Sequence, residues 1–188
     1  MNRAFLWLLE RFPVIHNLQI KLTYPKDIGN FLYLMEGLTV LPRTKILMLH
    51  LHNRGHNFGA SLFHILSLCT CLGGLSLVLN SHSDLKAQSS CPLGCVCNQP
   101  TDWKTEELTL NHLQEVVLID MKGSESEVVI VKRLPSWAMK LKRLRIIYRS
   151  TTVTKAMEVC QMLLSFAMPE THVTKNFHVK SKSCTFLR

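Results

Sequence analysis

A short apolar pattern returns along the chain, with three of its four intervals equal within one residue, and it constrains the fold more than any other feature. Its first members are separated by 29, 28, 41 and 28 residues. Alternation of apolar residues with period two buries one face of a β-strand. The sequence therefore predicts five repeated strands. Their inward residues are Leu18, Ile20, Leu22; Leu47, Leu49, Leu51; Leu75, Leu77, Leu79; Val116, Leu118 and, weakly, Asp120; and Leu144, Ile146, Tyr148.

Segments with helical spacing lie before these strands. We predict helices over 4–12, 31–41 and 151–167, each followed by a proline that cannot continue it. Two further helices are indicated by Leu62, Ile65, Leu66 and Cys69, and by Val128, Val131 and Ala138. Because Pro135 lacks an amide hydrogen, we expect it to kink the latter helix or end it at Leu134.

Several copies carry another apolar residue three positions before the triplet, as at Leu72, Leu113 and Leu141, which makes the L-x-x-L-x-L pattern of a leucine-rich repeat. Stacked helix–strand units bury a continuous core that one unit cannot bury alone. We therefore predict an α/β fold: a short leucine-rich-repeat solenoid, with a curved parallel sheet and helices on its convex side. Residues 1–80 would form repeats, 81–107 a loop insertion, and 108–188 the final repeats with a carboxyl-terminal helix.

The chain opens on an apolar helix, whereas the end units of solenoids need polar caps. We therefore expect a fragment of a longer protein, or a truncated product without function. The alternative is that an ordinary amphipathic helix is itself the cap.

Composition narrows the class of protein. The chain is 47% apolar with a net charge of +9, which is typical of one folded domain. The apolar run 4–9 is too short for a signal peptide, and seven unevenly placed cysteines do not make a disulfide framework. A cytoplasmic or nuclear location is expected. Segment 55–83 lacks Asp, Glu, Lys and Arg and could span a bilayer, but His56 and His64, the paired glycines and a change of period favour a helix–turn–strand unit.

Two groups of side chains could bind a metal. Cys91, Cys95 and Cys97 are close in sequence, and His82 or His112 could supply a fourth ligand, but the C-x3-C-x-C spacing is not the paired C-x2-C spacing of structural zinc sites. We therefore expect loop cysteines packed against Trp103 and no metal or other cofactor. The second group is His50, His52 and His56, for which ordinary surface histidines are favoured.

A basic run is the strongest electrostatic feature. Eight Lys and Arg residues and no acid lie between Glu127 and Glu158. Since Leu144 and Ile146 point inward, Arg143, Arg145 and Arg149 should face outward together and attract an acidic protein surface. A solvated face without a partner is the alternative. Nucleic acid is not expected, because the run lacks an aromatic stacking pattern.

No motif for catalysis is present: the chain has no G-x-S-x-G elbow, phosphate-binding glycine loop, H-E-x-x-H helix or dinucleotide fingerprint. We expect a protein-interaction module that uses the outward residues of its sheet, with partner contacts at His50, His52, Asn80, Arg143, Arg145 and Arg149. The full set of outward positions is Gln19, Lys21, His50, His52, Ser76, Val78, Asn80, Val117, Ile119, Arg143, Arg145 and Ile147.

The region from Cys91 to Ile146 resembles the FBD domain found at the carboxyl end of plant F-box proteins with leucine-rich repeats. The resemblance rests on Cys91-Pro92, Asn98-Gln99-Pro100, Trp103, Leu108, Leu110, Leu113, Val116, Gly123, Glu127, Val131-Lys132, Leu134, Ala138, Leu141-Lys142, Leu144 and Ile146. It implies a plant source and the substrate-capture part of a ubiquitin ligase receptor. The F-box itself has no counterpart before the first repeat, so docking to the ligase adaptor is not expected.

Overall fold

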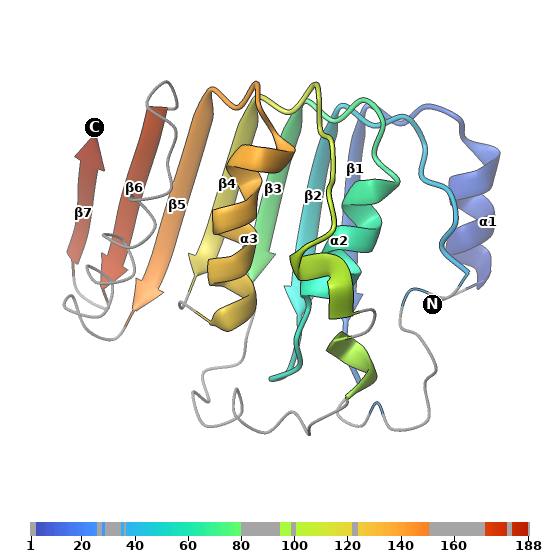
Figure 1. Ribbon diagram of the computed structural model, residues 1–188, viewed down its shortest axis with the longest axis horizontal. Helices are drawn as coiled ribbons and strands as arrows, with labels where there is room; N and C mark the ends of the chain where they lie inside the picture. The colour runs from blue at the N-terminus through green and yellow to red at the C-terminus, as the bar shows by residue number, and fades with distance from the viewer. Residues whose placement is uncertain are drawn as a thin grey trace.

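The computed structural model describes residues 3–25, 28, 35, 37–79, 95–98, 101–121, 124–150, 172–179 and 182–187. These residues form an α/β fold around one sheet, in which every strand lies beside its neighbour in sequence (Figure 1). The strands are β1 (Asn17–Thr23), β2 (Ile46–His52), β3 (Gly74–Leu79), β4 (Glu115–Met121), β5 (Arg143–Ser150), β6 (His172–Val179) and β7 (Lys182–Leu187).

Strands β1 to β6 are all parallel, and only β7 pairs antiparallel, with β6. The five predicted strands are confirmed, and their register follows the sequence pattern. Leu18 pairs with Leu47, Leu47 with Leu75, Leu75 with Val116, and Val116 with Leu144. The apolar triplets therefore form continuous rows across the sheet.

The inward rows make the core. Leu47, Leu49, Leu51 and Leu77 are at most 1% exposed, and the residues between them are half-buried or exposed. The alternation thus separates a buried face from an open one, because a one-residue step reverses the direction of the side chain.

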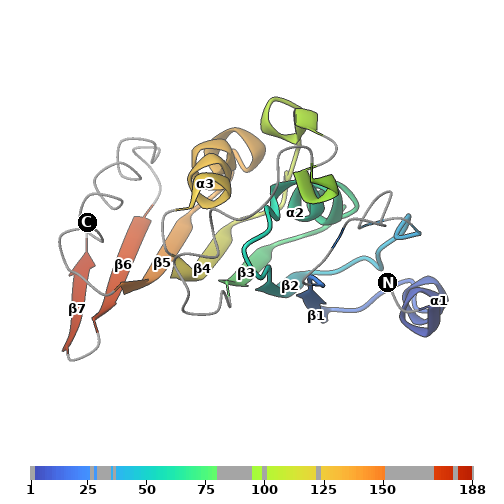
Figure 2. The same ribbon diagram turned by 90° about the horizontal axis from the view of Figure 1, so that it is seen from below.

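Among the described residues, the helices that lie over the sheet all cover its buried face, as Figure 2 shows. Helices α2 (Gly59–Ser67) and α3 (Glu125–Trp137) lie over the sheet, and α1 (Arg3–Arg11) lies at its edge beside β1. Leu62, Ile65 and Leu66 of α2 are fully buried, as their spacing predicted. Segment 55–83 therefore contains a short helix and a strand, and within the described residues no helix has both the length and the apolarity to cross a bilayer.

Of the two outcomes predicted for Pro135, the end of the helix at Leu134 was wrong. Helix α3 continues to Trp137 with Pro135 in its last turn. There the missing amide removes one hydrogen bond close to the helix end, while the Ala138 amide still donates to the Leu134 carbonyl at 2.9 Å and the Leu110 amide donates to the Trp137 carbonyl at 2.7 Å. The carboxyl end of α3 is thus secured by other donors.

The predicted helix over 31–41 falls mostly outside the described residues, but its end near Leu41 was wrong. Residues 37–41 are not helical, and Gly37 has a positive φ of 85°. The Leu38 carbonyl lies 2.7 Å from Nε2 of His64 in α2, so this carbonyl bonds to a side chain in place of a helical amide. The predicted helix 151–167 lies outside the described residues.

A sixth parallel strand follows at the repeat spacing, and the sequence patterns did not predict it. Val173 of β6 pairs with Leu144, 29 residues earlier. Lys175 interrupts the apolar alternation of Val173, Phe177 and Val179, which weakens the signal in the sequence.

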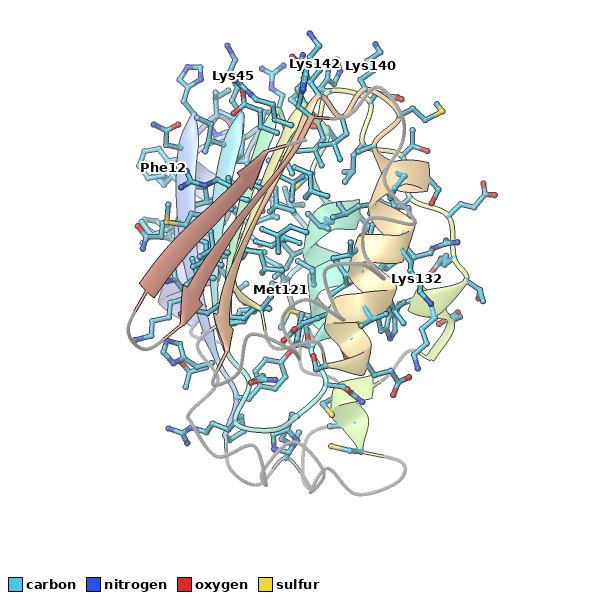
Figure 3. The ribbon with its side chains drawn as sticks, turned by 90° about the vertical axis from the view of Figure 1, so that its left-hand side faces the viewer. Phe12, Lys45, Met121, Lys132, Lys140 and Lys142 are labelled. Atoms are coloured by element: carbon cyan, nitrogen blue, oxygen red, sulfur yellow. The ribbon has the colours of Figure 1, made fainter. Side chains whose placement is uncertain are left out.

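A β-bulge explains why Asp120 fits the apolar pattern of its strand poorly. The register shifts between Ile119 and Met121, and Asp120 has a φ of 65°. Because of the extra residue, Met121 pairs with Tyr148 and is buried in the core (labelled in Figure 3). Met121, and not Asp120, therefore completes the apolar row in β4.

Candidate partner-binding surface

The candidate surface is the open face of the sheet, opposite α2 and α3. Its residues line up in two in-register rows across β1 to β5, and every side chain in them is exposed or half-buried. The rows consist of Gln19, Met48, Ser76, Val117 and Arg145, and of Lys21, His50, Val78, Ile119 and Ile147. Parallel pairing without a shift places these side chains side by side on a regular surface.

Polar contacts order both ends of this face. Nε2 of Gln19 lies 3.0 Å from Nε2 of His50 on the next strand. On β5, Arg143 forms an ion pair with Glu115 of β4. The basic run itself contains no acid, and the fold brings the Glu115 carboxylate to it from 28 residues before Arg143. Arg143 is therefore partly neutralised, and Arg145 lies two residues further along β5, opposite Val117.

A second group of cations borders the face at the amino ends of the strands. We define the basic rim as the exposed residues Arg43, Lys45, Lys140, Lys142 and Arg143. Figure 3 shows Lys45, Lys140 and Lys142 projecting from the same end of the molecule. Two repeats thus add their cations to one edge, where nearby like charges raise the local positive potential.

The backbone holds the rim in place through a ladder of hydrogen bonds between repeats. The amide of Lys45 donates to the His16 carbonyl at 3.1 Å, and the amide of Gly73 donates to the Lys45 carbonyl at 2.8 Å. The ladder continues from Gln114 to Gly73, from Lys142 to Gln114 and from His172 to Lys142, all at 2.9 Å. Lys45 and Lys142 therefore occupy equivalent positions, each directly before its strand.

The predicted partner residues divide into three groups. His50, His52, Arg143 and Arg145 lie at outward positions of β2 and β5, as predicted. Arg149 belongs to β5, but its side chain is outside the described residues, and so is the whole of Asn80.

Arg43 and Lys45 were missed. Their signal was available: each precedes the second triplet at the distance at which Lys140 and Lys142 precede the fifth.

In the structure, the histidines and cysteines are not grouped as they were in the sequence analysis. His56 is buried and separated from the outward-facing His50 and His52, so the three do not form one group. Cys97 is buried as well, while Cys91 lies outside the described residues. His56 instead meets Cys95, with Nδ1 and Sγ 3.7 Å apart.

Comparison of the chain with family models, with curated proteins and with solved structures finds no match.

Proposed function

We propose that this chain is a non-catalytic protein-interaction module that binds an acidic protein surface. The open face and the basic rim together would form the binding site, with Lys142 and Arg145 at their junction. The observation that carries the proposal is the set of in-register outward rows beside the rim. A rigid surface of this kind loses little conformational entropy on binding, and its positive potential would accelerate encounter with an acidic partner.

The architecture that we propose is a short leucine-rich-repeat solenoid. Three features support it: parallel strands in chain order, inward rows that return about every 28 residues, and the backbone ladder that joins successive repeats. The resemblance to the FBD region of plant F-box proteins would make the module the substrate-recognition part of a ubiquitin ligase receptor. Such a module would act in the cytoplasm or nucleus.

A charge-reversal experiment tests the binding site. The probe is a fluorescent peptide rich in Asp and Glu, and its binding is measured by anisotropy at low and physiological salt. The double variant Lys142→Glu/Arg145→Glu should weaken binding by about tenfold or more, because it places like charges against the peptide. The control is Lys132→Glu/Lys104→Glu, which makes the same change of charge on the helical side of the molecule. Lys132 lies on α3 (Figure 3), and Lys104 lies in the segment Thr101–Lys104, which contacts α2.

Equal weakening by both double variants would contradict the assignment to this face. Tighter binding of a single-stranded oligonucleotide of the same length and charge than of the peptide would favour a nucleic-acid partner and overturn the proposal. As a second measurement, a photo-crosslinking amino acid at Ser76 on the open face should capture the peptide, and one at Ser136 on α3 should not.

A further inference from the structure

Three potential metal ligands from distant parts of the sequence meet on the buried side of the sheet. They are His56, Cys95 and Cys97, whose ligand atoms all lie within 4.8 Å of one another. Cys95 and His56 are 39 residues apart in sequence. Cys97 is 1% exposed and His56 is 9% exposed, so the cluster is largely removed from water.

The histidine is held by the loop that follows β2. The His56 amide donates to the Asn53 carbonyl at 2.9 Å, and Nδ2 of Asn53 donates to the His56 carbonyl, also at 2.9 Å. Arg54 and Gly55 close this turn with positive φ values of 49° and 89°. The ring of Tyr24 stacks on the imidazole, with 6.3 Å between centroids. These contacts orient His56 before any metal binds.

The cysteines are brought in by two short 3-10 helices, η2 (Val96–Asn98) and η3 (Thr101–Lys104). Both contact α2. In η3, Trp103 is fully buried against Gly59, where even a Cβ atom would overlap the indole ring. This close packing fixes the neighbouring segment against α2 and brings Cys95 and Cys97 to the loop that carries His56.

The separations suit a tetrahedral zinc ion. With Zn–S bonds of about 2.3 Å and Zn–N bonds of about 2.05 Å, tetrahedral ligands lie about 3.6 Å (S to N) and about 3.8 Å (S to S) apart. Sγ of Cys95 and Nδ1 of His56 are already 3.7 Å apart, and the limit of 4.8 Å for the set means that no pair is more than about 1 Å too wide. Small side-chain rotations would close that difference.

We propose that His56, Cys95 and Cys97 bind Zn²⁺. Thiolate and imidazole are the ligands that zinc prefers, and a second thiol within reach favours a metal over a simple Cys–His pair. On binding, Cys95 and Cys97 would each lose a proton to solvent, and the neutral imidazole would donate a lone pair, so affinity should fall as the pH falls. The proposal is independent of the binding function assigned to the open face.

Such a site would cross-link two segments of the chain and stabilise the fold. The segment around η2 has no repeat of its own, and zinc would join it to the loop after β2. Because the site exists only in the folded chain, metal binding would stabilise the fold. We expect a higher melting temperature with zinc than after treatment with a chelator.

The full-length chain, purified without chelator or affinity metal, tests the site. Elemental analysis should find one zinc per chain, and Co²⁺ that replaces it should show thiolate-to-cobalt charge-transfer absorption. Cys95→Ser and His56→Gln should each lower zinc affinity by at least about tenfold, the loss usual for perturbing a metal site. Cys71→Ser is the matched control, because Cys71 is exposed and lies outside the cluster.

Cys95 is only half-buried, so Cys95→Ser is the variant most expected to fold, and circular dichroism checks that it does. Cys97→Ser is the second test. The proposal is overturned if the wild-type chain binds neither Zn²⁺ nor Co²⁺, if Cys95→Ser and Cys97→Ser keep wild-type zinc affinity, or if mass spectrometry under reducing-agent-free conditions finds Cys95 and Cys97 joined in a disulfide.

Discussion

Strands β2 and β3 and the inserted segment around η2 and η3 are buried by different means. In the strands, every second residue is a leucine, and the burial of each follows from local alternation. In the insertion, burial depends on single side chains, above all Trp103 on Gly59 and Cys97 near His56.

The two regions therefore differ in how many residues hold them in place. A strand in the sheet packs beside strands of the same pattern, so several equivalent side chains contribute to its burial. In the described part of the connection between β3 and β4, η2 and η3 contact α2, with Trp103 and Cys97 as their fully buried side chains. Stability of the insertion should therefore respond most strongly to changes at those anchors.

The largest effect is expected for Trp103→Ala. Removing a fully buried indole leaves a cavity over Gly59 and should lower the free energy of unfolding by about 3–5 kcal/mol. Chemical denaturation measures the change. The control Trp7→Ala removes a side chain that is 56% exposed and should cost less than about 1 kcal/mol. Equal losses from the two variants would show that Trp103 is not an anchor.

Alanine substitutions at two neighbouring residues of β2 should differ almost as much in their effect on the free energy of unfolding. Leu49→Ala removes a fully buried side chain and should lower the free energy of unfolding by about 2–5 kcal/mol. Met48→Ala, one residue earlier on the open face, should change it by less than about 1 kcal/mol. The same denaturation experiment gives both values, and a reversed order would exclude the observed alternation.

An effect of intermediate size on the free energy of unfolding is expected from Cys69, which lies just after the carboxyl end of α2. Burial raises the pKa of its thiol from 9.0 to about 12. Between these values the unfolded chain has lost this proton and the folded chain has kept it, so the free energy of unfolding should fall as the pH rises from about 9 towards 12. Cys69→Ala should reduce that fall.

Alkylation provides a direct check of the same thiol. At pH 9, iodoacetamide should modify the exposed Cys71 rapidly and Cys69 only slowly, as followed by peptide mass spectrometry. Comparable rates at the two positions in the folded chain would contradict the burial of Cys69.

The smallest change in stability is expected at the Glu115–Arg143 pair on the open face. Both side chains are substantially exposed, at 49% and 69%, so solvent and salt screen their attraction. Glu115→Gln should change the free energy of unfolding by about 1 kcal/mol or less. It should nevertheless strengthen binding of the acidic peptide, because it removes the carboxylate beside Arg143. Unchanged binding would place the site away from this pair.

Much of the sheet could be predicted from the sequence. The described inward and outward positions of the five strands and the helices around Leu62 and Val131 are local patterns that appear in the fold as expected. Asp120 is the exception, because a β-bulge puts Met121 in its place, and the side chain of Tyr148 lies outside the described residues. The sixth strand was missed because Lys175 breaks its alternation, and the end of α3 was misplaced because Leu110 supplies a donor from outside the helix.

The amino-acid sequence by itself determined which residues of the strands and helices enter the core. Apolar residues that recur every two positions lie on one side of a strand, and those that recur every 3.6 positions lie on one side of a helix. Only the tertiary structure decided which distant side chains meet. Glu115 beside Arg143 and His56 against Cys95 both depend on how distant segments pair and pack. No local pattern encodes these contacts, since each is set by the register between segments that the chain brings together only on folding.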